Sequence, residues 1–486
     1  MSNILSVLRV LALVLIIFSA TMLVPVAVSW ALNDGAQKAY DEGIAITFLA
    51  GLSLWLLTRN QRRELHVKDG FLLVVLAWTV LPAFATLPLL FFFWPNLSFT
   101  DAYFETVSGL TTTGATVLKG LDHLPYSINL WRAELVWLGG MGLIVLAVAI
   151  LPLLGVGGRQ IFKAEAPGPM KNSKLTPRMA ETAKGLWAIY GGITAACILS
   201  LKWAGMNWGD SLIHTFTIMG LGAFSSHDAS FGFFDSVKIE AVTILFMTLA
   251  GMNFATHFLA WRQKSLLPYN LDPEVRWYLN ILYGSVLGIA LYLWWMDTYL
   301  DFWSALRYSA FNVVSIATTT GFANTDYNQW PMFAPLWMLF LSSFVTCSGS
   351  TGGGIKIVRA MILYKQVFRE LVRSMHPSAV YPIKLGTESV PGNILFAVLA
   401  FGFMYMVILV SLTLLLAFTG LDIVTAFSAV VACVNNTGPG LNQVGPATTY
   451  AVLTDFQTWV CTLGMLLGRL EIFTLLVVLT PTFWRK

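Results

Sequence analysis

Charged side chains are scarce in this chain. Only 11% of its 486 residues are Asp, Glu, Lys or Arg, whereas 57% are hydrophobic. Soluble proteins average roughly 25% charged residues, because a folded chain covers its surface with groups that water solvates. The shortage excludes a soluble globular protein and predicts an integral membrane protein.

Cysteines and catalytic motifs are equally sparse. The four cysteines stand apart from one another with no C-x-x-C pair, so neither a disulfide framework nor a zinc site is predicted. His214, His227 and His257 lack metal-ligand spacing and are expected to be packing or loop residues. The sequence contains no H-E-x-x-H or G-x-S-x-G motif, so no enzyme is expected.

Long hydrophobic runs are abundant. Ten stretches are each near the ~20 residues needed to cross the hydrocarbon core of a bilayer. The first carries one charge, Arg9, and is longer than the roughly 7–15 apolar residues of a signal peptide, so an uncleaved helix is expected. The predicted spans are 4–32, 44–58, 70–94, 133–154, 185–205, 236–260, 277–296, 333–363, 392–418 and 456–483.

Basic residues divide unevenly between the two sides of the membrane. If the spans alternate, 22 Lys and Arg residues fall on one side and 6 on the other, with Arg469 left inside the membrane. The positive-inside rule assigns the richer side to the cytoplasm, which places both termini there. The net charge of +4 therefore reflects topology, and no nucleic-acid partner is expected. The many Trp and Phe residues are typical of contact with membrane lipid.

Four of the outer connections share a pattern. Residues 104–114 read F-E-T-V-S-G-L-T-T-T-G, and residues 311–321 read F-N-V-V-S-I-A-T-T-T-G. Residues 428–438, S-A-V-V-A-C-V-N-N-T-G, keep the valine and the final Thr-Gly, and residues 218–222, I-M-G-L-G, diverge most. The last glycines lie 108, 99 and 117 residues apart, so four tandem units are expected.

This periodicity predicts an all-α polytopic membrane protein. Four tandem repeats, each a helix, a pore hairpin and a second helix, are expected around a pseudo-fourfold central pore, with an N-terminal helical hairpin outside the scheme. The expected divisions are the hairpin at 1–66, repeat 1 at 67–160, a cytoplasmic linker with repeat 2 at 161–265, repeat 3 at 266–375 and repeat 4 at 376–486.

The tetrad that ends each pattern is the candidate ion-binding element. Consecutive backbone carbonyls that point at one axis replace the water around a dehydrating cation, and glycine permits the left-handed dihedrals that such a loop needs. The tetrads contain no Asp or Glu, which argues against a site for divalent ions, and threonine hydroxyls are expected to add further oxygens. The alternative is a plain Thr/Gly-rich turn. The candidate filter residues are Thr111, Thr112, Thr113, Gly114, Met219, Gly220, Leu221, Gly222, Thr318, Thr319, Thr320, Gly321, Asn435, Asn436, Thr437 and Gly438.

The span 333–363 contains a candidate gate. Residues 346–354 read T-C-S-G-S-T-G-G-G, and each glycine inside a helix costs roughly 1 kcal/mol relative to alanine. An intramembrane loop below the filter is predicted, with Gly349, Gly352, Gly353 and Gly354 as gate residues. A phosphate-binding loop lacks the required G-K-[S/T] ending, and a plain packing bend is the other alternative.

Arg469 is the second candidate for the gate. It is expected about halfway along the last span, where an arginine costs about 2.5–3.5 kcal/mol and usually faces a cavity or a partner. Its guanidinium is predicted to bind carbonyls of the 346–354 loop and to place a positive charge in the ion path. Snorkelling to the membrane surface is the alternative. Glu471 is expected to pair with a different neighbour.

The four tetrads, the segment T-G-F-A-N-T-D at 320–326 and the segment N-N-T-G-P-G at 435–440 resemble the Trk/Ktr family of bacterial potassium transporters. The additional N-terminal hairpin makes the chain most similar to the TrkH and TrkG branch of that family. The resemblance covers essentially the whole chain. It implies potassium uptake across the inner membrane, a homodimer, and gating by cytosolic nucleotide-binding subunits of the TrkA type. An ion-coupled symporter of a small solute is the competing function, and potassium is the one cofactor-like ligand expected.

Overall fold

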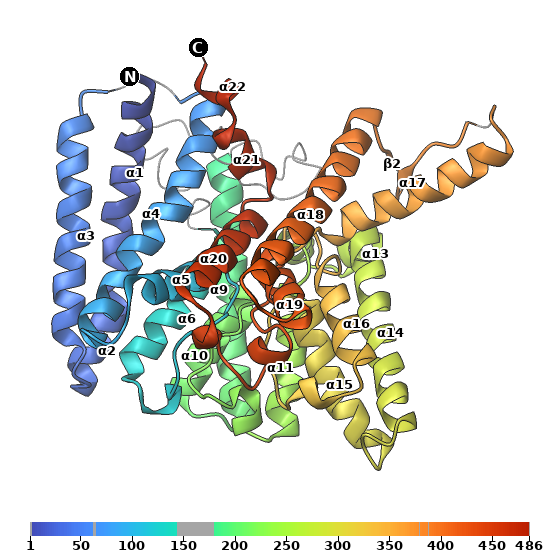
Figure 1. The fold of residues 1–486 in the computed structure, drawn as a ribbon, viewed down its shortest axis with the longest axis horizontal. Helices are drawn as coiled ribbons and strands as arrows, with labels where there is room; N and C mark the ends of the chain where they lie inside the picture. Colours follow the sequence, from blue (N-terminus) through green and yellow to red (C-terminus); the bar gives the residue numbers. More distant parts are fainter. Residues whose placement is uncertain (1, 62–64, 143–178, 379, 387, 486) are drawn as a thin grey trace.

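The computed structural model describes residues 2–61, 65–142, 179–378, 380–386 and 388–485, and most of these residues are helical. Long helices run through the molecule and shorter helices lie between them (Figure 1). Within the described ranges, the sheet structure is one antiparallel ladder of β1 (Lys384–Leu385) and β2 (Glu388–Ser389). The expected all-α polytopic membrane fold is confirmed.

The N-terminal helices pack against one side of the molecule. α1 (Ser2–Thr21) and α2 (Leu23–Leu32) cover the first predicted span, and α3 (Gln37–Thr58) runs back alongside α1 (Figure 1). Only 22% of the most apolar stretch of α3 is buried. Most of its hydrophobic surface therefore faces outward, as in a helix that contacts lipid.

The other helices form four successive groups, each with a long helix followed by a short one of 12 to 16 residues. The first group is α4 (Val67–Phe93), α5 (Phe99–Leu110) and α6 (Tyr126–Gly140), and the second is α9 (Met179–Ala204), α10 (Trp208–Gly220), α11 (Val237–Ala250) and α12 (Phe254–Gln263). The third is α13 (Leu267–Leu271), α14 (Pro273–Trp295), α15 (Phe302–Ala317), α16 (Phe333–Ser342) and α17 (Ile357–Met375). The fourth is α18 (Gly392–Phe418), α19 (Ile423–Val434), α20 (Asp455–Arg469), α21 (Phe473–Leu479) and α22 (Pro481–Trp484).

Each short helix begins at a polar cap. The side chains of Ser98, Asn207, Asp301 and Asp422 accept a hydrogen bond from the backbone N–H three residues later, at 3.1, 2.7, 2.7 and 3.0 Å. Such a cap stabilises a helix by about 1 kcal/mol, because it satisfies one of the free N–H groups of the first turn. The common cap explains why α5, α10, α15 and α19 start where they do.

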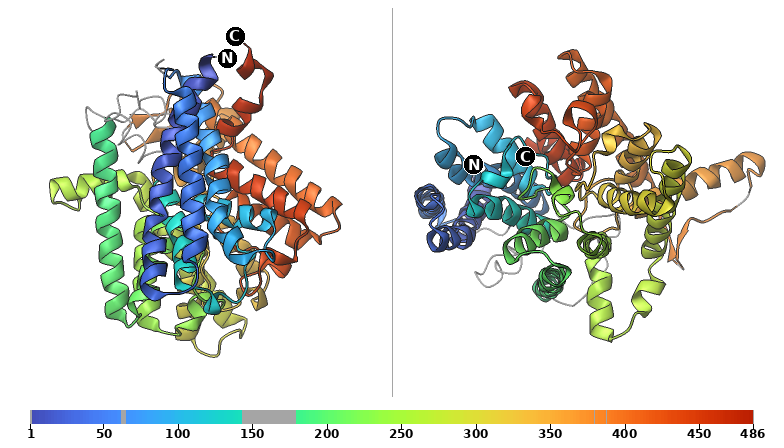
Figure 2. Two further views of the ribbon diagram at one scale, coloured as in Figure 1. Left: turned by 90° about the vertical axis from the view of Figure 1, so that its left-hand side faces the viewer. Right: turned by 90° about the horizontal axis from the view of Figure 1, so that it is seen from below.

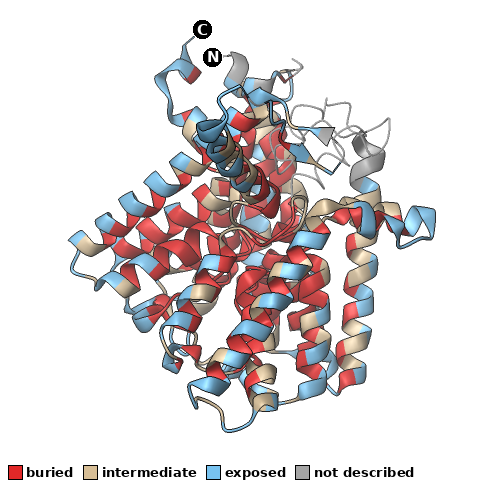
Figure 3. Ribbon diagram, turned by 90° about the vertical axis from the view of Figure 1, so that its right-hand side faces the viewer, coloured by how far each residue is buried: buried red, intermediate tan, exposed pale blue. Residues whose placement is uncertain are grey.

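Seen end-on, the four groups occupy successive sectors around the middle of the molecule (Figure 2). Buried residues gather in this middle region, and exposed residues lie along the outer helices and at the helix ends (Figure 3). The first described helix begins, and the last described helix ends, on the same side of the molecule (Figures 1 and 2).

Several predicted spans differ from the helices observed. Among the described residues, six segments are long and apolar enough to cross a membrane as straight or gently bent helices, and two sharply bent pairs raise the number to eight. Of the other two predicted spans, 133–154 is described only as far as residue 142, and 333–363 is broken between α16 and α17. The break expected at 346–354 lies inside this interruption.

The predicted span 236–260 is not one straight helix, because α11 and α12 meet at 94°. The neighbouring 343–356 segment satisfies the freed backbone groups. Cys347 donates its N–H to the carbonyl of Gly251 at 3.0 Å, and Phe254 donates to the carbonyl of Gly349 at 3.1 Å. Irregular backbone at membrane depth is tolerated where protein supplies such partners.

The predicted span 456–483 also bends, because α20 and α21 meet at 111°. Glu471 and Ile472, between the two helices, adopt left-handed φ angles of 52° and 56°. Arg469 is therefore the last residue of α20, at the bend, and not the middle of a continuous helix.

Candidate functional site

Three of the four short helices end in the same turn. After α5, α15 and α19 the second tetrad residue is left-handed, with φ of 59° at Thr112, 62° at Thr319 and 55° at Asn436. In each case the third residue donates its N–H at 2.8 Å to a carbonyl five residues earlier in the helix. The fourth residue is a glycine with φ of 77°, 86° or 101°, a conformation that side chains with a Cβ rarely adopt.

The backbone of the second loop follows the same path, although its residues differ. Its left-handed residue is Leu221, with φ of 56°, and the next residue, Gly222, donates at 3.0 Å to the carbonyl of Thr217, five residues earlier. Leu221 thus corresponds to Thr112, and Ala223 corresponds to Gly114. The matching tetrad is Gly220–Ala223, one residue later than the tetrad 219–222 expected from the sequence.

The four loops meet at the position of the last tetrad residue. A methyl group built on Gly321 or on Gly438 would lie 2.9 Å from Cβ of Ala223, and one built on Gly114 would lie 2.6 Å from it. A methyl group on Gly438 would also lie 2.7 Å from the carbonyl oxygen of Thr113. Backbone atoms from all four helix groups, called the four quarters of the chain from here on, therefore surround one point. There is no room at this point for a larger side chain.

The sixteen residues expected in the filter are all buried. Several of the threonine hydroxyls are hydrogen-bonded within the loops. Thr111 and Thr113 hydrogen-bond to each other at 2.8 Å, and Thr318 and Thr320 do so at 2.7 Å. Asn436 donates to the Thr113 hydroxyl at 3.0 Å. These bonds hold the first and third loops in shape, and the expectation that threonine hydroxyls add ion ligands stays a prediction.

The electrostatics of the meeting point favour a cation. Each tetrad follows the C-terminus of its short helix, and a helix C-terminus carries roughly half a negative charge. Four such ends converge here. Within the described residues there is no group of three or more His, Cys, Asp or Glu side chains arranged to hold a metal ion.

The segment 343–356 lies against the third and fourth tetrads and against Met219, the residue just before the second tetrad. The hydroxyl of Thr351 donates to the carbonyl of Met219 at 2.9 Å, and Gly353 donates its N–H to the hydroxyl of Thr319 at 2.9 Å. A methyl group on Gly353 would overlap the carbonyl of Asn435. Glycine is therefore the one residue that allows this close approach.

The same segment is held from its own side. Thr346 donates its hydroxyl to the carbonyl of Gly353 at 2.9 Å, and Lys356 donates to the carbonyl of Gly352. Gly349 and Gly354 take left-handed φ angles of 73° and 77°. The four expected gate glycines thus form one compact loop below the tetrads.

Arg469 joins this loop to the first quarter of the chain. Its guanidinium donates to the carbonyl of Thr351 at 3.0 Å and to the hydroxyl of Thr112 at 3.3 Å. It also donates to the carbonyls of Gly139, and of Gly140 at 3.2 Å, at the end of α6. The expected contact between Arg469 and the 346–354 loop is present. Glu471 pairs with Arg359 at 2.7 Å.

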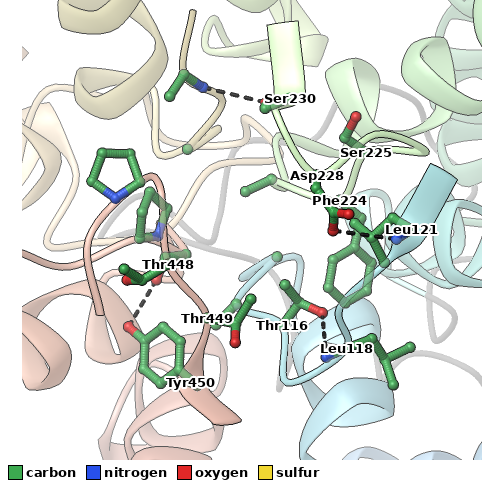
Figure 4. A pocket seen from close by; sticks show the side chains of 18 of the residues that line it. Thr116, Leu118, Leu121, Phe224, Ser225, Asp228, Ser230, Thr448, Thr449 and Tyr450 are labelled. Atoms are coloured by element: carbon green, nitrogen blue, oxygen red, sulfur yellow. Dashed lines mark hydrogen bonds between the residues drawn. The ribbon is translucent and has the colours of Figure 1, made fainter. Parts of the chain in front are cut away.

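A cavity opens on the other side of the tetrads. Gly114, Ala223, Gly321 and Gly438 line it, together with residues of the segments that follow the tetrads, several of which are labelled in Figure 4. About 600 Å³ of empty space lies within it, including the part open to solvent.

His227, at the rim of the cavity, forms two ion pairs, one of which joins the first and second quarters. Nδ1 of His227 lies 2.5 Å from Asp122, in the turn Leu121–His123, and Nε2 lies 3.3 Å from Asp210 at the start of α10. Burial alone would lower the pKa of His227, but the two carboxylates outweigh it and raise the pKa above its ordinary value. His227 is therefore positively charged over a wider pH range than a free histidine.

Comparison with known proteins decides the family. A model described as TrkH, cation transport protein, matches residues 36–486. The chain belongs to the TrkH family. The Trk system potassium uptake protein TrkH of Halomonas elongata is 46% identical over 481 residues, covering 99% of each chain. The Trk system potassium uptake protein TrkG of Escherichia coli K12 is 36% identical over 470 residues, covering 97% of this chain and 96% of the relative.

A solved structure of the TrkH family has the same fold. The crystal structure of the potassium transporter TrkH from Vibrio parahaemolyticus matches with a TM-score of 0.90 and 43% identity, covering 99% of this chain and 100% of that chain. The resemblance inferred from the tetrads is confirmed at the level of the family. Ala223 is the tetrad residue that sequence reasoning missed, because the letters G-L-G at 220–222 match a glycine ending better than G-A does.

Proposed function

We propose that this chain carries potassium ions into the cell across the bacterial inner membrane, through one pore whose narrowest part is the ring of four tetrads. The observation that carries the proposal is the meeting of Gly114, Ala223, Gly321 and Gly438 around one point. A ring of backbone carbonyls at the C-termini of four helices replaces the hydration shell of a monovalent cation. The relatives named as potassium uptake proteins support potassium as that cation.

The gate in this proposal is the 343–356 loop together with Arg469. The loop contacts the third and fourth tetrads and the residue before the second, and Arg469 contacts both the loop and the first tetrad. A positive charge next to the ion path repels a cation, and this repulsion is strong where water is excluded. Movement of the loop away from the tetrads, with Arg469, would open the pore.

The remaining parts of the proposal rest on the family resemblance and on topology. Both termini lie in the cytoplasm, the chain forms a homodimer, and TrkA-type cytosolic subunits control the gate. The division into an N-terminal hairpin at 1–66 and four repeats from 67 onward belongs to the same proposal. The chain acts as a transporter and not as an enzyme. An ion-coupled symporter of a small solute is the less supported alternative, because the relatives are named for potassium uptake.

Uptake of rubidium, a potassium substitute, into vesicles that contain the purified protein tests the proposal. Gly321→Ser is expected to reduce uptake at least about tenfold, because a Cβ there overlaps the carbonyl of Thr437 and requires a strained φ of 86°. Gly420→Ser is the matched control. Gly420 also has a positive φ, of 92°, but a methyl group built on it meets no described atom within 4 Å. Equal uptake by wild type and Gly321→Ser would overturn the filter assignment.

A further inference from the structure

The segment that leaves the first tetrad is held by a buried carboxylate of its own short helix. Glu105, on α5, accepts hydrogen bonds from the hydroxyl of Thr116 at 2.9 and 3.0 Å and from the N–H of Val117 at 3.0 Å. Its side chain is completely buried. The first tetrad is thus clamped between the end of α5 and a bond back to the middle of the same helix.

Arg132, on α6, completes this clamp. Its Nε lies 2.8 Å from Glu105, and its side chain is 1% exposed. It also donates to the hydroxyl of Thr116 at 3.2 Å and to the carbonyl of Ser225, beyond the second tetrad, at 3.2 Å. Arg132 neutralises the carboxylate beside the cavity and links the first quarter of the ring to the second.

In each of the other three quarters, too, a side chain of the short helix hydrogen-bonds to the segment after the tetrad. We call this contact a brace. Glu105 stands nine residues before Gly114, and His214 and Asn312 stand nine residues before Ala223 and Gly321. His214 Nδ1 lies 2.9 Å from the carbonyl of Asp210, which only accepts, so its Nε2 accepts from the hydroxyl of Ser225 at 2.9 Å.

Neutral side chains form the last two braces. Asn312 donates to Asn324 at 2.6 Å, and the hydroxyl of Ser428, ten residues before Gly438, accepts from the N–H of Leu441 at 2.8 Å. All four bonds reach the second or third residue after the tetrad. The four quarters thus share one device made from four different side chains.

We propose that Glu105 with Arg132, His214, Asn312 and Ser428 are positioning residues that hold the ring of tetrads at a fixed width and so set its discrimination between potassium and sodium. The inference rests on the proposed function. None of the four braces ends at the meeting point itself, so they act on the ion through the backbone.

The physical reason lies in the flexibility of a backbone ring. A ring of carbonyls that can contract solvates the smaller sodium ion almost as well as potassium, whereas a ring held from behind cannot follow the smaller ion inward. Support of a binding site by locked hydrogen bonds outside it is what keeps its geometry within fractions of an ångström. Buried hydrogen bonds are suited to this, because a low local dielectric strengthens them.

Thr116→Val tests the first brace with little risk to folding, since it removes one hydroxyl and keeps the side-chain volume and the Glu105–Arg132 pair. The measurement is the sodium concentration that halves rubidium uptake into vesicles. Thr116→Val is expected to lower this concentration at least about threefold, because it removes the hydrogen bonds of this hydroxyl with Glu105, Arg132 and the N–H of Leu118. Thr116→Ser restores the hydroxyl and is expected to behave as wild type.

Thr449→Val is the matched control. Thr449 lines the same cavity (Figure 4), and its hydroxyl has no hydrogen-bond partner among the described residues. Its sodium sensitivity should equal that of wild type. Ser225→Ala tests the second brace independently and should change sodium sensitivity in the same direction as Thr116→Val.

The outcomes separate the two proposals. Wild-type protein that takes up no rubidium contradicts the proposed function. Active protein in which Thr116→Val and Ser225→Ala both keep wild-type sodium sensitivity contradicts only the brace. A loss of selectivity in Thr449→Val equal to that in Thr116→Val would also overturn it, because the effect would then come from the cavity wall.

Discussion

The first and second tetrad loops follow the same backbone path, although their tetrads share no residue at matching positions. The first reads T-T-T-G at 111–114, and the second reads G-L-G-A at 220–223. Both place a left-handed residue at the second position of the tetrad, at Thr112 and Leu221. They differ at the meeting point, where Gly114 has a φ of 77° and Ala223 is not in the left-handed region. The residue at the meeting point must therefore be small, and it must be glycine only in the loops where that residue has a positive φ.

The largest effect is expected from enlarging Ala223. Ala223→Leu should lower rubidium uptake at least about tenfold, because the longer side chain must enter the space shared with Gly114, Gly321 and Gly438. Ala223→Gly should keep uptake within about twofold, since alanine and glycine both adopt the φ found at this position. Uptake assays on the two variants, with expression matched, compare them. Wild-type uptake by Ala223→Leu would show that the second loop meets the axis at another residue.

The two loops also differ in their contacts on the side of the 343–356 segment. Arg469 donates to Thr112 in the first loop, and Thr351 donates to Met219, just before the tetrad of the second. Arg469→Ala is expected to raise basal rubidium flux about fivefold or more, since it removes both the positive charge and the link to the loop. Thr351→Val removes one hydrogen bond, to the carbonyl of Met219, and should raise flux about twofold.

Arg469→Lys serves as the control for charge, because lysine keeps the charge but cannot repeat the forked contacts of arginine. It should give a flux between those of wild type and Arg469→Ala. The gate assignment fails for Arg469 if Arg469→Ala, expressed normally, leaks no more than wild type.

The smallest effect concerns His227, in the segment after the second loop, which pairs with Asp122 after the first loop and with Asp210 at the start of α10. Asp228, whose carboxylate accepts from the N–H of Leu121, is the other charged group at this contact. Because the pKa of His227 is raised in the folded protein, its stabilising charge is fully present below the ordinary histidine pKa of about 6.5. That contribution is lost as the pH rises through the raised pKa.

Thermal unfolding of the purified protein at a series of pH values measures this contribution. Wild type should lose about 1 °C more than His227→Gln between pH 6 and pH 9. Parallel curves for the two proteins would remove His227 from the account of how the first two quarters are joined.

The sequence predicts the parts of this molecule that depend on local pattern. The span 392–418 coincides with α18, because an uninterrupted apolar run has one way to cross a bilayer. The tetrads of the first and third loops are found because their letters repeat. The break at 346–354 follows from three consecutive glycines, and the contact of Arg469 with that loop follows from the need of a buried charge for partners.

The features that sequence reasoning missed depend on contacts between distant residues. The bend between α11 and α12 relies on backbone partners near residues 347 and 349, almost a hundred residues away. The register of the second loop is decided by where its backbone meets the other three loops. Glu105 and Arg132 carry no sign in the sequence that they pair, and His214 was expected only to pack. Such pairings appear once the four quarters are assembled around one axis.

The position of a bound monovalent cation tests the central claim most directly. Crystals grown or soaked with rubidium, measured at its absorption edge, would locate the ion by anomalous scattering. The account predicts a peak on the axis between Gly114, Ala223, Gly321 and Gly438, within reach of backbone carbonyls from all four quarters. A rubidium peak bound elsewhere, with the space between these four residues empty, would contradict it.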